Sequence, residues 1–179
     1  MSILLIGLHE ELTGALVARL VGEGDEVRVL EDSTESGESW RILGAHIAQG
    51  PMWDADLIER AAQNVRTIVV GEHHDHDPAE LIDAVVTGGG FASKDMRIVL
   101  VGDDLEAPAI GTLRESPLAY VALGAGTRRS LLGRRRLPAP DILAEVIDAA
   151  DDLAGEVRLE LDLGDEQSWS ELKLPIPES

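Results

Sequence analysis

Two groups of histidine and acidic side chains are the part of this sequence best suited to catalysis or metal binding. One is the run EHHDHD at residues 72–77, and the other is Asp103 with Asp104, each directly after an aliphatic block. Parallel strands end at one edge of a sheet, where open α/β folds bind ligands. Imidazoles and carboxylates gathered there can hold Zn, Ni, Mn or Fe, or supply a general base. His74, His76 and Asp103 are therefore candidate catalytic residues, and His74 and His76 are candidate metal ligands.

A simpler interpretation of the same run is a loop that caps a helix. Neighbouring residues of an extended loop alternate in direction, so at most alternate histidines such as His74 and His76 share a face. Asp75 and Asp77 precede Pro78, a pattern that is typical of the start of a helix. We therefore expect an incidental polar loop and no bound metal.

Short aliphatic blocks alternate with helix-like patterns along the whole chain, which predicts strands separated by helices. Strands are expected at residues 3–6, 26–30, within 42–48, 67–70, 97–101, 118–123 and 157–163. Helices are expected after the first strand, from Asp54, from Pro78 to the glycines at 88–90, and from Pro140. A polar loop is expected at residues 31–38.

This alternation is typical of right-handed βαβ units. We predict an α/β fold with a doubly wound parallel sheet of about six to seven strands. The sheet and its helices are expected to form a single domain at residues 1–165, followed by a C-terminal tail at residues 166–179.

Composition limits the partners and the chemistry of the chain. Thirty-four acidic residues oppose 15 basic ones, which gives a net charge of −19 and argues against nucleic acid and anionic membranes. The sequence has no cysteine, so thiolate chemistry and cysteine-bound zinc are excluded. No basic stretch precedes the first apolar run, and no window approaches the roughly 20 apolar residues of a membrane span. We expect a cytoplasmic protein.

The turn after the first expected strand is where such folds bind a dinucleotide, because the next helix presents unpaired N–H groups to the pyrophosphate. Of the three glycines usual there, only Gly7 is in register. Glu10 and Thr13 take the other two positions, and Gly14 comes one place late. A carboxylate at position 10 would repel phosphate and weaken binding. Alternatively, Glu10 is simply a favourable acidic residue in the first turn of a helix.

Four segments of the chain carry a resemblance to a known family. They are ILLIG at residues 3–7, ALVARL at 15–20, LGAHIAQGPMWD at 43–54 and LIERAA at 57–62. Together they resemble the atypical, NmrA-like branch of the short-chain dehydrogenases, over roughly residues 1–165. The resemblance implies a Rossmann fold and an NAD(P) site. The candidate cofactor-binding residues are Gly7, Leu8, His9, Glu10, Leu12, Glu31, Asp32, Met52 and Gly71.

Two features near the expected NAD(P) site bear on how it would contact adenine and on which cofactor it would prefer. In the family an aspartate that contacts adenine usually stands where this chain has Pro51, which offers neither a side-chain hydrogen bond nor an N–H. Glu31 and Asp32 follow Gly7 by about 24 residues, near the spacing of an acid that binds the adenosine ribose. Such an acid pair favours NAD over NADP, because it repels a 2′-phosphate. Solvated loop acids are the alternative.

The family's catalytic Tyr-x-x-x-Lys pair is missing. Tyr120 is the only tyrosine, position 124 is glycine, and the surrounding residues predict a strand. Only 16 residues separate Val101 from Leu118, so the helix that carries the pair in the family is expected to be shortened or deleted. Gly102, followed by Asp103, replaces the family's serine.

These losses favour a non-catalytic protein, either a dinucleotide sensor or a scaffolding subunit. The alternative is an enzyme with altered chemistry, an oxidoreductase or a metal- or acid–base-dependent enzyme. It would use the loop from His73 to Asp77, with Asp103 or Asp104, on a small substrate.

Five of the 15 basic residues are arginines at positions 128, 129, 134, 135 and 136. This arginine-rich segment, from Arg128 to Arg136, could close over a small anion or contact an acidic partner or a second copy of the chain. Leucines between the arginines favour a contact surface, and a solvated loop is the alternative. The tail around Trp169 could dock on its own domain or on a partner.

Overall fold

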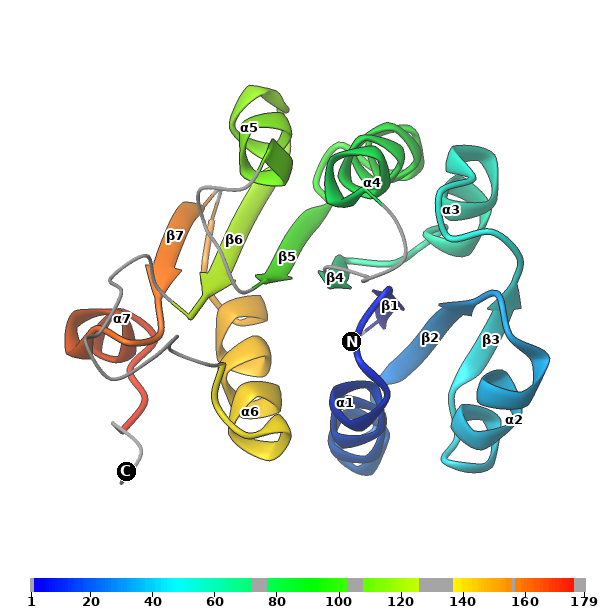
Figure 1. Ribbon diagram of the computed structural model, residues 1–179, viewed down its shortest axis with the longest axis horizontal. Helices are drawn as coiled ribbons and strands as arrows, with labels where there is room; N and C mark the ends of the chain where they lie inside the picture. The colour runs from blue at the N-terminus through cyan, green and yellow to red at the C-terminus, as the bar shows by residue number, and fades with distance from the viewer. Residues whose placement is uncertain (1, 72–76, 103–107, 126–136, 156, 176–179) are drawn as a thin grey trace.

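Strands paired in parallel throughout form a single sheet (Figure 1). The computed structural model describes residues 2–71, 77–102, 108–125, 137–155 and 157–175. The sheet has seven strands in the order β3-β2-β1-β4-β5-β6-β7, which confirms the predicted doubly wound arrangement. The strands are β1 (Ser2–Ile6), β2 (Glu26–Glu31), β3 (His46–Gln49), β4 (Thr67–Gly71), β5 (Arg97–Gly102), β6 (Ala119–Gly124) and β7 (Arg158–Asp162).

Helices cover both faces of the sheet (Figure 1). They are α1 (Glu10–Glu23), α2 (Thr34–Ile42), α3 (Ala55–Ala61), α4 (Pro78–Ala92), α5 (Pro108–Glu115), α6 (Pro140–Asp151) and α7 (Glu166–Glu171). One layer contains α3, α4 and α5, and the other contains α1, α2, α6 and α7. The central strand β1 needs both layers, because Ile3 and Leu5 enter one core cluster while Leu4 and Ile6 enter the other.

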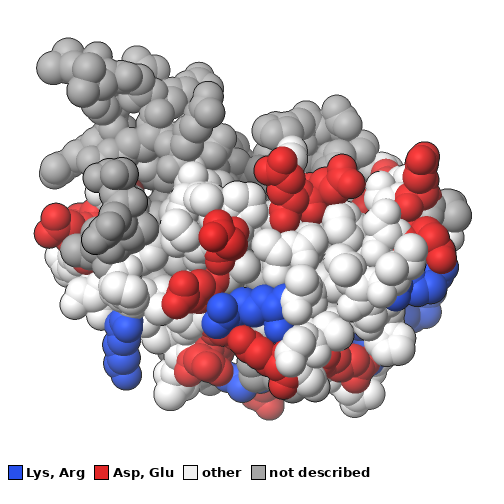
Figure 2. Space-filling view, turned by 90° about the horizontal axis from the view of Figure 1, so that it is seen from below, with Lys and Arg blue, Asp and Glu red and all other residues white. Residues whose placement is uncertain are grey.

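The outer surface of the layer with α1 and α6 is acidic. Figure 2 views the molecule from this side and shows acidic side chains spread over the face, with basic ones between them. Arg19 on α1 donates to Asp148 on α6 at 2.8 Å, which raises the pKa of Arg19. Because both side chains are partly exposed, this bridge adds little stability, and the face remains a poor surface for anions.

The prediction of a loop at residues 31–38 is wrong, because α2 begins at Thr34. Ser33 caps the helix by accepting a hydrogen bond from the Ser36 amide at 3.4 Å. Trp40 anchors it in the core with 5% of its surface exposed. A Cβ on Gly14 of α1 would lie 3.3 Å from the Trp40 ring. One cap and one aromatic side chain therefore outweigh the polar composition, and Gly14 is a packing glycine.

The expected end of a helix at the glycines 88–90 is also wrong, because α4 continues to Ala92. A Cβ at position 88 would come within 2.5 Å of the Ala55 carbonyl oxygen, and one at position 89 within 3.1 Å of Ile68. These two glycines let α4 lie against α3 and β4. They have a packing role here, and the buried helix tolerates their low helix propensity.

The segment after β7 docks on its own domain. Trp169 of α7 is 4% exposed within the core cluster under α1 and α6, and its indole N–H donates to the Leu163 carbonyl at 3.0 Å. Of the two arrangements open from the sequence, the structure therefore shows the intramolecular one for Trp169.

Candidate functional site

The strand order reverses at β1, and this reversal defines the candidate site. β1 pairs with β2 on one side and with β4 on the other, and the chain leaves these strands in opposite directions. The connections after β1 and β4 consequently diverge at the carboxyl edge of the sheet. Open α/β folds bind ligands in the crevice at such a point.

The backbone of the turn after β1 lies very close to the end of the neighbouring strand β4. Gly7 has a φ of 63°, a conformation that favours glycine. On the neighbouring strand, a Cβ at Gly71 would lie 2.6 Å from the Gly7 carbonyl oxygen and 3.0 Å from the Leu8 Cα. The turn at residues 7–9 can therefore take this position only because residue 71 has no side chain.

Substitution of Gly71 by alanine tests that contact. We expect Gly71→Ala to lower the free energy of unfolding by about 1–2 kcal/mol, because the Gly7 carbonyl must move away from the new methyl group. Urea unfolding followed by circular dichroism measures the change. Gly111→Ala in α5 is the control, because a Cβ there meets nothing within 4 Å. Equal stability of Gly71→Ala and the wild type would show that the turn does not depend on this glycine.

Helix α1 starts from this turn without a side-chain cap. His9 is extended and makes no capping hydrogen bond, and Ala139 before α6 makes none either. Ser33, Asp54, Asp77 and Asp165 cap their helices. The first amides of a helix have no partner within it. At α1 they are left for an external acceptor such as a phosphate oxygen.

A small hollow of about 30 Å³ lies beside the turn. It is lined by Leu5, Ile6, Gly7, Leu8, Thr13, Val29, Leu30, Glu31 and Met52. Four of the cofactor-binding candidates from the sequence thus surround one hollow. It is large enough only for a water-sized group, so a dinucleotide would lie over its rim.

Glu31 brings a carboxylate to this hollow from the end of β2. Its Oε1 accepts hydrogen bonds from the Asp32 amide at 3.1 Å and the Ser33 amide at 3.3 Å. The side chain of Asp32 is its other polar neighbour. Burial raises the pKa of Glu31, and the nearby Asp32 adds to the rise while the two backbone amides oppose it. Glu31, rather than the exposed Asp32, is therefore the acid placed to receive a hydroxyl donor.

The remaining candidates take other positions. His9 and Glu10 are exposed, and Glu10 lies in the first turn of α1, where an acid stabilises the helix. Leu12 is 6% exposed in the core, so its side chain does not line the hollow. Thr13 does line it, and its hydroxyl donates to the His9 carbonyl at 3.2 Å. Thr13 is absent from the predicted cofactor-binding residues, although its place at a glycine position of the turn was a signal for it.

Tyr120 lies far from this turn in the topology, as the sequence predicts for a strand residue. It is the second residue of β6, near the amino edge, and its hydroxyl donates to Glu160 Oε1 at 3.1 Å. Burial, followed by Glu160, raises the pKa of Tyr120, which is opposite to the shift that proton transfer near neutral pH requires. The eight-residue α5 between β5 and β6 confirms the expected shortening.

Several predicted residues lie outside the described part of the chain. They are His74, His76, Asp103, Asp104 and the arginine-rich segment. At the edge of this gap, Asp77 caps α4 by accepting from the Ala79 amide at 2.9 Å, as the capping interpretation predicts.

Within the described ranges, no group of three or more His, Asp or Glu side chains could hold a metal ion. No helix in those ranges is long and apolar enough to cross a membrane.

Comparisons with solved structures agree with this geometry. ChuY, an anaerobillin reductase from Escherichia coli O157:H7, superposes with a TM-score of 0.72 over 89% of this chain and 95% of that one, at 14% identity. The fold is of the Rossmann type. A short-chain dehydrogenase/reductase from Veillonella parvula DSM 2008 matches the Rossmann domain with a TM-score of 0.62 over 87% and 88% of the two chains, at 14% identity.

A third structure, the Citrobacter sp. triphenylmethane reductase complexed with NADP(H), gives a TM-score of 0.69 at 13% identity. The match covers 90% of this chain and 69% of that one. No protein-family model and no curated protein matches the sequence. At these identities the likeness shows a Rossmann-type fold.

Proposed function

We propose that this Rossmann domain binds a nicotinamide dinucleotide at the carboxyl edge of β1 and β4, and that it prefers NAD to NADP. The adenosine would lie over the hollow between Glu31 and Met52, and the pyrophosphate would lie against the uncapped start of α1. The observation that carries this proposal is the half-buried Glu31 carboxylate, which lines the hollow and is held there by two backbone amides. A ribose with two free hydroxyls can donate to it, whereas a 2′-phosphate would be repelled.

The proposed affinity is low. Glu10 opens α1 where a phosphate would approach, and Thr13 fills the space that a third glycine leaves free. The bound dinucleotide would supply hydride chemistry, while the described residues would bind and orient it. In the described part of the chain, no tyrosine lies at that edge to deliver a proton. The proposed role is therefore that of a dinucleotide sensor or a scaffolding subunit.

A contact between the arginine-rich segment and an acidic partner, or a second copy of the chain, belongs to the scaffolding form of this proposal.

A second candidate is a reductase with altered acid–base chemistry. The similarity to an anaerobillin reductase of comparable length favours it, since the alignment covers 95% of that chain. Its proton would come from His74, His76 or Asp103. Oxidation of bound NADH by a reducible substrate, followed at 340 nm, would support the reductase over the sensor.

Calorimetric titration with NAD and NADP tests the proposal. We expect a dissociation constant for NAD above about 100 μM, and NADP should bind more weakly still. Glu31→Gln should weaken NAD binding about tenfold, because the amide keeps the bonds to the two backbone N–H groups but loses the charged acceptor. Glu115→Gln, at an exposed residue at the end of α5, is the control and should leave the affinity unchanged. Low-micromolar binding or a preference for NADP would contradict the proposed site.

A further inference from the structure

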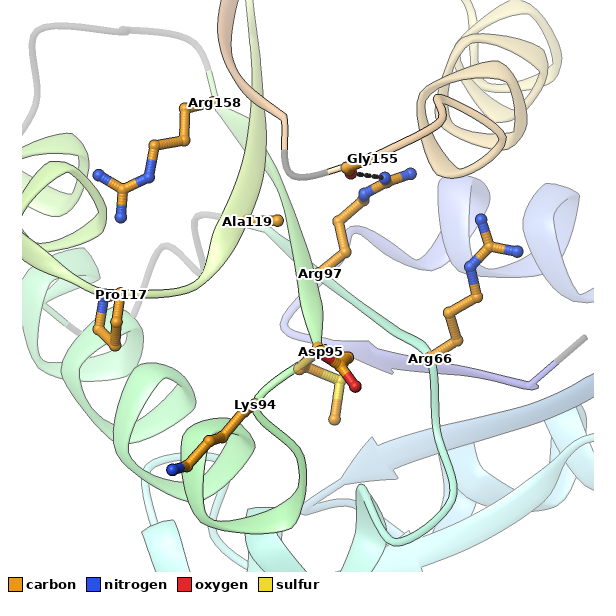
Figure 3. Close-up of a pocket in the computed structure, with 9 residues that line it drawn as sticks. Arg66, Lys94, Asp95, Arg97, Pro117, Ala119, Gly155 and Arg158 are labelled. Atoms are coloured by element: carbon orange, nitrogen blue, oxygen red, sulfur yellow. Dashed lines mark hydrogen bonds between the residues drawn. The ribbon is translucent and has the colours of Figure 1, made fainter.

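A second and larger hollow lies at the amino edge of the sheet, opposite the turn at Gly7. Its volume is about 300 Å³. It lies at the beginnings of the strands of one half of the sheet, and Figure 3 shows the residues that surround it. They are Arg66, Lys94, Asp95, Met96, Arg97, Pro117, Ala119, Gly155 and Arg158.

The lining of this amino-edge hollow is cationic in a strongly acidic protein. The lining contains four basic side chains and a single carboxylate, that of Asp95, although the chain as a whole carries a net charge of −19. The ion pairs between described residues involve none of Lys94, Arg97 and Arg158. Positive charge is therefore concentrated in this lining, although the carboxyl groups of Asp151 and Asp152 lie close enough behind it to act on Arg97.

Arg97 is held in place by neutral acceptors. Its side chain is 6% exposed, and its terminal nitrogens donate to the carbonyls of Ala150, Asp151, Leu153 and Gly155; Figure 3 shows the last of these bonds. Its Nε is buried and has no hydrogen-bond partner in the described structure. Burial lowers the pKa of Arg97, so this cation has lost hydration that the carbonyls do not fully replace.

Arg158 is positioned in the same way on the other side of the hollow. It donates to the carbonyls of Arg114, at 3.3 Å, and Ser116, and its guanidinium lies 5.8 Å from the centroid of the Tyr120 ring. Carbonyl oxygens and an aromatic ring orient a guanidinium without removing its charge. Lys94 is exposed and has no partner among the described residues, so its ammonium is free to reach a bound ligand.

We propose that the amino-edge hollow binds a small phosphate-bearing anion. Positioned guanidinium groups with an added flexible ammonium are the side chains that recognise phosphate oxygens. The excess of positive charge in the lining matches a dianion, and the volume admits an organic group attached to the phosphate. This site lies at the opposite edge from the proposed dinucleotide site and is independent of it.

Thermal melting in inorganic phosphate, against sodium chloride of equal ionic strength, tests the proposal. At a phosphate concentration ten times the dissociation constant, the melting temperature should rise by about 4 °C above the chloride value. Lys94→Ala should bind phosphate about fivefold more weakly without changing the melting temperature in chloride, because its side chain makes no contact that folding needs.

Lys173→Ala is the matched control. It removes the only other lysine, which is exposed beyond α7, and changes the net charge equally. Its phosphate affinity should equal that of the wild type. Equal losses in both lysine variants, or equal melting temperatures of the wild type in phosphate and chloride, would overturn the proposal. Glu31→Gln should keep the phosphate affinity of the wild type, because Glu31 lies at the opposite edge of the sheet. A failure of the phosphate proposal can thus be distinguished from a failure of the dinucleotide proposal.

Discussion

Replacing Gly88 by alanine is expected to lower the free energy of unfolding by about 2–3 kcal/mol. A Cβ at this position would lie 2.5 Å from the Ala55 carbonyl oxygen, 2.9 Å from Ile58 Cβ and 3.0 Å from the Glu59 amide nitrogen. Two of these three atoms belong to the backbone of α3, so no side-chain rotation can relieve the contact. The two helices would have to separate over the buried face of β4.

Gly90→Ala is the matched control for this prediction. Gly90 lies in the same helix, but a Cβ there meets nothing within 4 Å. Alanine should stabilise the helix by about 0.5–1 kcal/mol at this position. Denaturant unfolding of both variants measures the two changes, which should have opposite signs. A Gly88→Ala variant as stable as the wild type would show that α3 and α4 do not pack as closely as described.

The second large effect is expected at Asp151, a carboxyl group inside the protein. It is the last residue of α6 and has no exposed surface. Oδ1 accepts a hydrogen bond from the Thr67 hydroxyl, whereas Oδ2 is buried without a partner among the described residues. Burial raises the pKa of Asp151 above its ordinary value, although Thr67, Arg66 and Arg97 oppose the rise.

We expect Asp151→Asn to stabilise the protein at pH 7 by about 1–2 kcal/mol, because asparagine keeps an acceptor for Thr67 without burying a charge. A carboxyl group whose pKa is raised by folding binds its proton more tightly in the folded state. Its contribution to stability therefore grows as the pH falls through the folded pKa toward the ordinary value of 3.8. The advantage of the variant should shrink over that same interval.

Urea unfolding of the wild type and Asp151→Asn between pH 4 and pH 7 measures this difference. Asp83→Asn is the control, because Asp83 is an exposed acid of α4 that has no part in the environment of Asp151. It should follow the wild type across the whole range. A wild type that is more stable than Asp151→Asn at pH 7 would mean that Arg66 and Arg97 compensate the buried charge fully.

The parallel sheet could be predicted because its strands are short aliphatic blocks that must be covered on both faces. The two wrong predictions were the loop at residues 31–38 and the helix end at residues 88–90. Both arose where tertiary contacts override the local preference of the sequence for a secondary structure. The residues around Ser36 look like a loop until Trp40 packs on Gly14, and the glycines at 88 and 89 look like a stop until α3 packs against them. In both cases the partner is distant in sequence, so local pattern gives no signal of it.

The two hollows also differ in how far the sequence predicts them. Gly7 and Glu31 follow the first two strands, so the topology alone predicts that they meet at one edge. Arg66, Arg97 and Arg158 are scattered along the sequence and share no motif. They line one hollow because each lies at the start of β4, β5 or β7 or directly before it, and this requires the strand order and register.

The parallel pairing also sets the order in which the sheet can assemble. Among the described strands, no two consecutive ones form a hairpin, so each pair can form only after the segment that connects it has been made. β1 lies at the centre of the sheet, yet its partner on one side begins at Thr67, which pairs with Ile3. On the ribosome, the open edge of β1 stays without its second strand until β4 has emerged. Because these distant pairs form slowly, the chain is most exposed to aggregation while only its amino-terminal half has been made.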